Sequence, residues 1–109
     1  MNSKPGVNVE AEVRKIFELF SKGEFAAGLG QAQRLHQQYP NLAISNYCVG
    51  HGLASTNRFG AALEFLKRAV ELQPENPEYL VRYGRVLLDV GQILHAEAVL
   101  NKAYRLNPK

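Results

Sequence analysis

The sequence predicts an all-α fold, an α-solenoid of three similar helical hairpins with six antiparallel helices. The first observation is that apolar residues recur three and four positions apart in two runs, at 80–88 and 93–106, as on one face of a helix. Gly91 interrupts the pattern between these runs, which makes 79–108 a helical hairpin. The second observation is that this hairpin is a copy of the residues before it.

A shift of 34 residues, the offset between Gly50 and Gly84, brings matching residue types into register. The other matched pairs are Leu53 and Leu87, Ala62 and Ala96, Leu66 and Leu100, Ala69 and Ala103, Leu72 and Leu106, and Pro74 and Pro108. A fixed period of this size indicates a stacked helical array rather than a domain with one central core.

Two columns of the period separate the expected helices. One column holds residues that readily adopt a left-handed backbone and so end the first helix of each hairpin: Gly23, Asn57 and Gly91. The other column holds the prolines that stop the second helix: Pro40, Pro74 and Pro108. We therefore expect helices at about 8–20, 24–38, 42–55 and 58–72 before the final hairpin, with Asn8 and Asn76 as N-caps.

Small residues mark the places where the two helices of a hairpin should approach closely. Gly50 and Gly84 lack a Cβ and allow the second helix to pack tightly on the first. Ala62 and Ala96 are the expected small partners in that contact.

These columns resemble the tetratricopeptide repeat. The third copy reads Leu80-x-x-Tyr83-Gly84-x-x-Leu87, Ala96-x-x-x-Leu100, Pro108, and the second reads Asn46-x-x-Val49-Gly50-x-x-Leu53, Ala62-x-x-x-Leu66, Pro74. Asn46 departs from the bulky residue of the family, and in the first copy only Leu19, Phe25 and Pro40 keep the pattern. The resemblance covers about 9–109, where it implies a domain with repeats at about 9–42, 43–76 and 77–109. The residues before it include Pro5 and Gly6 and little to bury, so we expect a flexible lead-in at 1–8.

Composition excludes several classes of protein. Hydrophobic residues make up 46% of the chain, enough for a folded core, but no apolar run reaches the roughly 20 residues that cross a membrane. The N-terminal residues have no apolar core, so they are no signal peptide. A single cysteine fits a reducing, cytoplasmic location. The net charge of +3 is mild and dispersed, which disfavours nucleic acid as the partner.

Few residues suggest chemistry. Cys48 and His51 lie three apart on one expected helix, so a metal or a thiolate–imidazole pair is conceivable. His36 and His95 belong to other repeats, and a lining role for Cys48 is favoured because free cysteine usually behaves as a small hydrophobe. No phosphate-binding glycine loop, nucleophile elbow or zinc motif is present, so we expect no cofactor, no metal and no catalysis.

The resemblance implies that the first helix of each repeat lines a concave groove for an extended peptide or a partner's helix. The period places the candidate residues in two rows, one of Val13, Tyr47 and Val81 and one of Phe17, His51 and Arg85. We expect these side chains to be exposed there, the alternative being that some only pack between helices. Arg82 and Arg85 lie one turn apart and could hold a carboxylate or phosphate, or could be a solvated pair.

The family's clamp for the terminal carboxylate of chaperone tails uses Lys and Asn side chains. The corresponding positions here are Val13, Phe17, Cys48, Glu78 and Arg82. Only Arg82 fits, and Glu78 would repel a carboxylate, so that ligand class is disfavoured.

The sequence therefore favours a protein-interaction scaffold. One alternative is a regulatory or substrate-presenting arm of a larger enzyme, for example a transferase. RNA binding by a related 35-residue helical repeat is disfavoured by the period and by Gly84, Ala96 and Pro108.

The last helix has no following helix to cover it, so we expect Lys109 not to be a natural end of the array. Leu100, Ala103 and Tyr104 should be open to water, unlike Leu66, Ala69 and Val70 one repeat earlier. We accordingly expect either a longer parent protein or self-association through the last helix.

Overall fold

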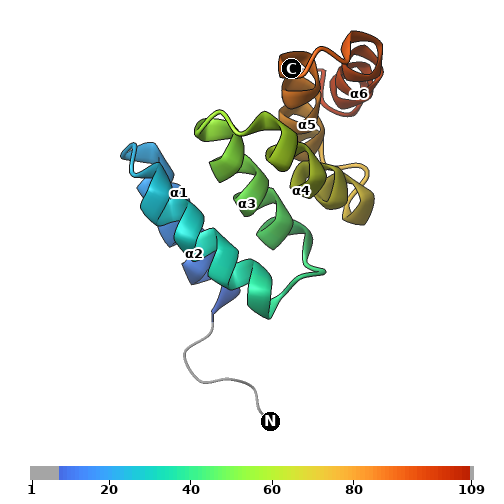
Figure 1. The fold of residues 1–109 in the computed structure, drawn as a ribbon. Helices are drawn as coiled ribbons and strands as arrows, with labels where there is room; N and C mark the ends of the chain where they lie inside the picture. Colours follow the sequence, from blue (N-terminus) through green and yellow to red (C-terminus); the bar gives the residue numbers. More distant parts are fainter. Residues whose placement is uncertain (1–7, 109) are drawn as a thin grey trace.

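The computed structural model describes residues 8–108, and over this range it consists of six α-helices and no strand (Figure 1). The helices are α1 (Val9–Ser21), α2 (Phe25–Gln38), α3 (Ala43–Ser55), α4 (Phe59–Leu72), α5 (Pro77–Asp89) and α6 (Ile93–Leu106). The predicted all-α solenoid is confirmed. The lead-in predicted at 1–8 lies outside the described residues except for Asn8, whose side chain accepts a hydrogen bond from the Ala11 N–H at 3.0 Å and caps α1.

The helices form an elongated array of 44 × 28 × 24 Å in which each helix packs against its neighbours in sequence. The first helices of successive hairpins, α1, α3 and α5, also approach one another, whereas the backbones of the second helices, α2, α4 and α6, stay apart. Because only the first helices converge, the array curves with these helices on its inner side.

The turns inside the three hairpins share one geometry. Gly23, Asn57 and Gly91 have positive φ angles of 78°, 64° and 84°. After each of these residues the next backbone N–H donates to a carbonyl five positions earlier at 2.9 Å, from Glu24 to Leu19, from Arg58 to Leu53 and from Gln92 to Leu87. This bond satisfies a carbonyl that the end of the helix leaves free, as in a Schellman motif. The predicted left-handed column is therefore correct.

Glycines on the first helices allow leucines of the second helices to approach. A Cβ built on Gly50 would lie 2.6 Å from Cγ of Leu66, and one on Gly84 would lie 2.6 Å from Cγ of Leu100. The expected partners, Ala62 and Ala96, are fully buried, but the atoms closest to the glycines belong to the leucines. That part of the prediction is corrected, because the leucine side chain fills the space that the glycine leaves.

The first hairpin reverses these sizes. Ile16 stands in the glycine column and Ala32 in the leucine column, and both are completely buried. A large residue on α1 and a small one on α2 thus replace the small and large pair of the later hairpins. Total volume is maintained, which explains how the hairpin forms although its sequence follows the repeat pattern poorly.

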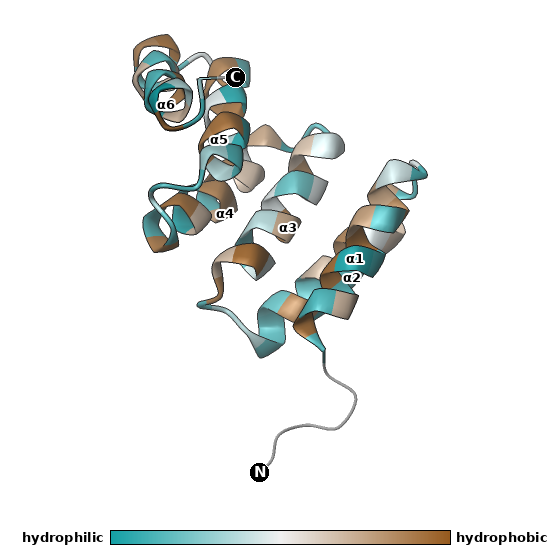
Figure 2. Ribbon diagram, turned by 180° about the vertical axis from the view of Figure 1, so that it is seen from behind, coloured by the Kyte–Doolittle hydropathy of each residue, from teal (hydrophilic) through white to brown (hydrophobic). Residues whose placement is uncertain are grey.

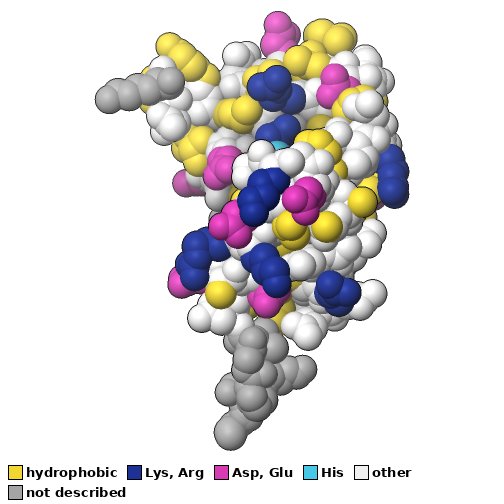
Figure 3. Space-filling model, turned by 90° about the vertical axis from the view of Figure 1, so that its left-hand side faces the viewer, with side chains coloured by type: hydrophobic (Ala, Val, Ile, Leu, Met, Phe, Trp, Pro, Cys, Tyr) yellow, Lys and Arg dark blue, Asp and Glu magenta, His cyan; other side chains and the backbone are white. Residues whose placement is uncertain are grey.

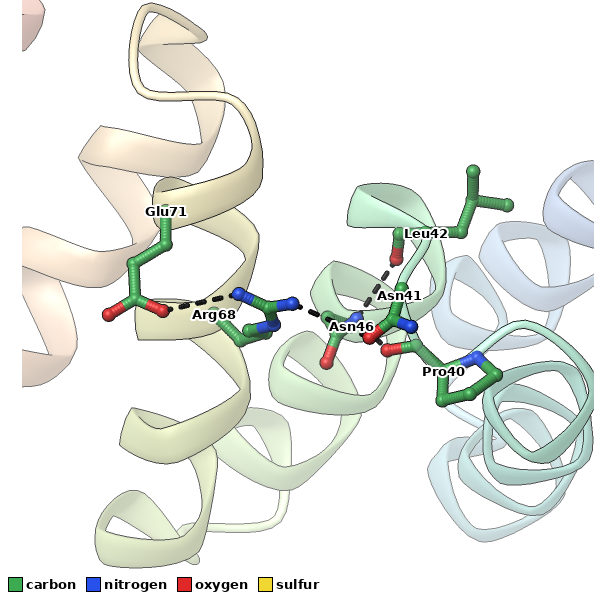
Figure 4. A network of polar contacts seen from close by, with 6 residues as sticks. All are labelled: Pro40, Asn41, Leu42, Asn46, Arg68 and Glu71. Carbon is green, nitrogen blue, oxygen red and sulfur yellow. Dashed lines mark hydrogen bonds and ion pairs between the residues drawn. The ribbon is translucent and has the colours of Figure 1, made fainter.

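Asn46 replaces the bulky residue of the repeat with a polar anchor. Its side-chain amide donates to the backbone carbonyls of Pro40, at 3.0 Å, and Leu42, at 2.9 Å (Figure 4). Arg68 of α4 donates to the Asn41 side chain at 3.4 Å and forms an ion pair with Glu71 at 3.6 Å. These bonds hold the loop between α2 and α3 against the second hairpin and satisfy a buried polar side chain.

The core runs along the whole array rather than forming one centre. Hydrophobic residues are distributed over all six helices (Figure 2), and α3, which lies between two hairpins, is almost entirely buried. Among the described residues, no helix is both long and apolar enough to cross a membrane.

Candidate interaction groove

A groove of about 650 Å³ lies where α5 and α6 meet the edge of α3. Its walls are the beginning and inner face of α5, the C-terminal half of α6 and one residue of α3: Tyr47, Asn76, Pro77, Glu78, Val81, Arg82, Arg85, Leu100, Ala103, Tyr104 and Asn107. This volume is typical of ligand-binding clefts. Of the seven candidate residues from the sequence, Tyr47, Val81, Arg82 and Arg85 line this α5–α6 groove.

Tyr47 reaches the groove only at its edge. The residue is 3% exposed, and its ring stacks on the Tyr79 ring with 4.5 Å between centroids and 22° between planes. The expectation that Tyr47 is exposed was wrong, because α5 covers this part of α3. Burial raises the pKa of the Tyr47 hydroxyl, and the neighbouring Arg82 guanidinium acts in the opposite direction.

An aromatic cluster lies at the other end of the inner face and contains Phe17 and His51 together with Phe20 and Tyr47. His51 lies 5.5 Å from Phe17, 5.0 Å from Phe20 and 6.0 Å from Tyr47, measured between ring centroids. Phe17 and His51 are half-buried, as is Val13, which packs against the core. The structure therefore brings Phe17 and His51 together with Tyr47. Unlike Tyr47, the residues Val13, Phe17 and His51 do not line the groove.

His51 is held in its neutral form. Burial, and then the positive charge of Arg82, lower its pKa to about 4. Its Nδ1 is buried and has no hydrogen-bond partner within residues 8–108. At neutral pH the ring is thus an uncharged part of the aromatic cluster.

The charge of the groove comes from α5. Arg82 is half-buried and Arg85 is exposed, and neither forms an ion pair within the part of the chain that the structure describes. Glu78 is the one acid in the groove lining, and Val81, which is 40% exposed, adds apolar surface between the charges. The groove can therefore contact an apolar side chain and a negatively charged group together.

On the face drawn in Figure 3, basic side chains do not gather into one patch. On the side of the molecule shown in Figure 3, Lys and Arg side chains lie among acidic and hydrophobic ones. This arrangement lacks the continuous basic surface that usually follows a nucleic-acid backbone.

Cys48 does not line the groove. It is completely buried in the core, and burial raises the pKa of its thiol to about 12. The expected lining role is corrected, because α5 packs over this face of α3. Among the described residues, no three His, Cys, Asp or Glu side chains are close enough together to hold a metal ion.

The groove residues that sequence reasoning missed lie at the start of α5 and just after α6: Asn76, Pro77 and Asn107. Leu100 is half-buried and Tyr104 is 65% exposed, as expected for an uncovered face. Ala103 is only 3% exposed, contrary to expectation, because its short side chain does not reach beyond its own hairpin. The 34-residue period could have identified the groove, since its α6 wall matches the residues of α4 that lie next to α5.

Comparisons with solved structures agree with this architecture. The chain superposes on a mutant O-GlcNAc transferase of Thermobaculum terrenum with a TM-score of 0.92 and 25% identity, over 100% of this chain and 21% of that one. The chain thus spans about a fifth of the length of the transferase.

Two further similar structures are complexes. The Yersinia enterocolitica type III secretion chaperone SycD, in complex with a peptide of the translocator YopD, has a TM-score of 0.81 and 16% identity over 91% of this chain and 76% of that one. The TPR2B domain of yeast Sti1, in a complex with pHsp70, has a TM-score of 0.81 and 18% identity over 90% and 78%. Both likenesses show the fold alone.

No curated protein matches the sequence. A family profile described as tetratricopeptide repeat matches residues 53–109, which is just over half of the chain and includes the second helix hairpin in part and the third in full. This match agrees with the 34-residue period, the left-handed turns and the glycine–leucine contacts. The chain belongs to the tetratricopeptide repeat family.

Proposed function

We propose that the chain is a protein-interaction scaffold that binds a peptide or helix of a partner protein on its inner face. The observation that carries the proposal is the α5–α6 groove, in which Arg82 and Arg85 have no acidic partner within residues 8–108 and lie beside exposed Val81. Arginine and aromatic side chains contribute most of the energy in many interfaces. The complex of SycD with a YopD peptide and the complex of Sti1 with pHsp70 support this use of the fold.

The proposed surface extends from the groove to the half-buried side of the aromatic cluster. Val13, Phe17 and His51 lie on the inner helices α1 and α3, and Tyr47 connects them with the groove through its contacts with Phe17 and Tyr79. A partner bound along the inner face would thus contact apolar and aromatic side chains near α1 and α3, and the two arginines on α5.

The chemistry of the groove favours an acidic side chain over a free C-terminal carboxylate. A clamp for a chain terminus needs several cations, and Glu78 stands where one of them would be required. Arg82 and Arg85 together suit a single Asp or Glu side chain next to an apolar one. We propose the cytoplasm as the location, since the single cysteine is a buried thiol.

Capture of a partner by variants of the groove tests the proposal. Wild-type chain and the variants Arg85→Ala, Val81→Ala and Lys67→Ala are immobilised and exposed to a native lysate, and the captured proteins are quantified by mass spectrometry. Lys67 is exposed on α4, away from the groove, and serves as the control. We expect the two groove variants to lose about tenfold in capture of the same partner, equivalent to about 1.4 kcal/mol. Equal capture by all four proteins would exclude the groove.

A second candidate is supported by the likeness to the Thermobaculum terrenum O-GlcNAc transferase. In this reading the hairpins are a regulatory or substrate-presenting arm of a larger enzyme, and the inner face binds the enzyme's protein substrate. The length of the open reading frame distinguishes the two candidates. A catalytic domain encoded in the same frame would support the arm, whereas its absence would leave the scaffold.

A further inference from the structure

We propose that the α5–α6 groove is the binding site, or seat, of an amphipathic helix from a partner protein, and that this helix docks in the way that α5 docks on α3 and α4. This inference rests on the proposed function. The partner helix would carry an acidic side chain that pairs with Arg85. Two seats that are one repeat apart correspond to each other: the surface of α3 and α4 that α5 covers, and the α5–α6 groove.

The floor of the two seats is nearly the same. Leu66 and Ala69 are completely buried, and they belong to α4, the helix on which α5 packs. Their counterparts one period later, Leu100 and Ala103 on α6, line the groove, and nothing within residues 8–108 lies over them in the place that α5 takes. The groove therefore has the shape into which a helix, rather than an extended peptide, fits.

The upper walls of the two seats differ in charge. Arg82 and Arg85 of the groove occupy the positions that Cys48 and His51 occupy, one period earlier, in the seat beneath α5. Where the first seat has half-buried Val70, the groove has Tyr104, 65% exposed. A helix that docks here must accordingly offer negative charge and a surface for an aromatic ring.

The position of the acid follows from the contacts of α5. Arg82 lines the groove together with Tyr47, and its positive charge contributes to the pKa shifts of both Tyr47 and His51, so it lies near these two residues of α3. The residues one period after Tyr47 and His51 are Val81 and Arg85. A docked helix thus brings the side chain at its own Arg82 position against Arg85, where an acid is attracted and an arginine is repelled.

A second copy of this chain is less well suited to the seat. Its terminal helix, α6, carries Lys102 and Arg105 against a single acid, Glu97, so this helix has a net positive charge and would be repelled by Arg82 and Arg85. The repulsion disfavours the self-association through α6 that the uncovered apolar side chains suggested, and favours an acidic partner.

The chain's own α5 supplies the probe. A helix-stapled, fluorescent peptide with the sequence of residues 76–90 and the substitution Arg82→Glu is titrated with the full chain, and fluorescence anisotropy gives the Kd. The matched control is the same stapled peptide with Arg82 retained. We expect the Glu peptide to bind at least about fivefold more tightly, as expected for exchanging one repulsive for one attractive contact.

Charge reversal on the chain tests the pairing itself. With Arg85→Glu, the order of the two peptides should invert, while Lys67→Glu, an equal change of charge outside the groove, should leave it unchanged. A version of the Glu peptide with Gly84→Pro and no staple, which cannot form the helix, should lose binding. Equal binding of the helical and helix-broken peptides would overturn the docked helix, and an order that Arg85→Glu does not invert would overturn the acidic contact.

Two further outcomes separate this inference from the proposed function. If the natural partner is captured through the inner face but the Glu peptide does not bind, the helix seat is wrong and the scaffold stands. If neither the peptide nor a partner binds through Arg85, both are wrong. Sedimentation of the chain alone that shows a dimer dissociated by Tyr104→Glu would assign the seat to a second copy and overturn the proposal.

Discussion

The ring of Tyr79 on α5 stacks on the ring of Tyr47 on α3, with centroids 4.5 Å apart. This contact joins the second and third hairpins and removes Tyr47 from water except at the edge that lines the α5–α6 groove. Tyr47 is therefore first a residue of the interface between repeats, and only the small part of it that lines the groove is available to a partner.

We predict that Tyr47→Ala and Tyr47→Phe differ in their effect on the stability of the fold. Tyr47→Ala removes a buried ring and should destabilise the fold by about 3–5 kcal/mol. Tyr47→Phe keeps the stack and removes only the buried hydroxyl beside Arg82, so it should cost less, about 0.5–1.5 kcal/mol. Chemical denaturation measures both. A Tyr47→Ala chain as stable as wild type would show that the stack does not hold the hairpins together.

The glycine–leucine contacts predict a ranking of alanine substitutions. Gly50→Ala places a methyl group against Leu66, which is completely buried and cannot move aside, so it should cost about 1–3 kcal/mol. Gly84→Ala should cost less, because Leu100 is half-buried and can shift. Gly30→Ala is the control, since no atom lies within 4 Å of its Cβ, and it should stabilise α2 by about 0.5–1 kcal/mol. A measured order with Gly50→Ala as the mildest change would refute the packing described here.

The alanine column makes a related prediction. Ala96 is completely buried between α6 and α5, so Ala96→Leu should overpack the hairpin and lower its stability by about 1–3 kcal/mol. Ala98, exposed on the same helix, is the matched control, and Ala98→Leu should stay within about 0.5 kcal/mol of wild type. Thermal unfolding compares the two, and equal midpoints would contradict this helix pairing.

His51 should make stability depend on pH. Its pKa is lowered from 6.5 to about 4 in the folded chain, so between these values the unfolded chain binds more protons. The free energy of unfolding should then fall as the pH falls from 6.5 toward 4, by at most about 1.4 kcal/mol per pH unit and less because the ring is half-buried. His51→Phe keeps an aromatic ring beside Phe17 and Phe20 and removes the titration.

Denaturation of both proteins across this pH range measures the difference, since acidic residues titrate alike in both. His51→Phe should have the flatter profile. Two profiles of equal slope would mean that His51 is not desolvated in the folded chain.

The fold could be predicted from the sequence because most helix ends and close contacts depend on particular residue types at fixed positions. The left-handed turns at Asn57 and Gly91, the cap at Asn76 and the close approach at Gly50 all depend on the chemistry of single residue types at a fixed period. The reversed pair of Ile16 and Ala32 could not be identified in this way, since it keeps the packing of the hairpin while changing both members of the pattern.

The site could be predicted only in part. A period indicates which residues share a face of the helix, and Val81, Arg82 and Arg85, which were expected on one face, all line the α5–α6 groove. It does not indicate how far the next helix covers that face, and for this reason Tyr47 and Cys48 were expected at the surface although α5 buries them. Coverage is a property of the stacked array and not of a single repeat.

The most direct test of the interaction surface is photo-cross-linking at single positions. A benzophenone side chain is placed at position 85, in the groove, or at position 67, on the exposed side of α4, and each protein is irradiated in native lysate with and without excess unlabelled chain. We predict a cross-linked partner at position 85 that the excess chain competes away, and none at position 67. A competable cross-link at position 67 with none at position 85 would contradict the account, because the partner would then bind outside the inner face.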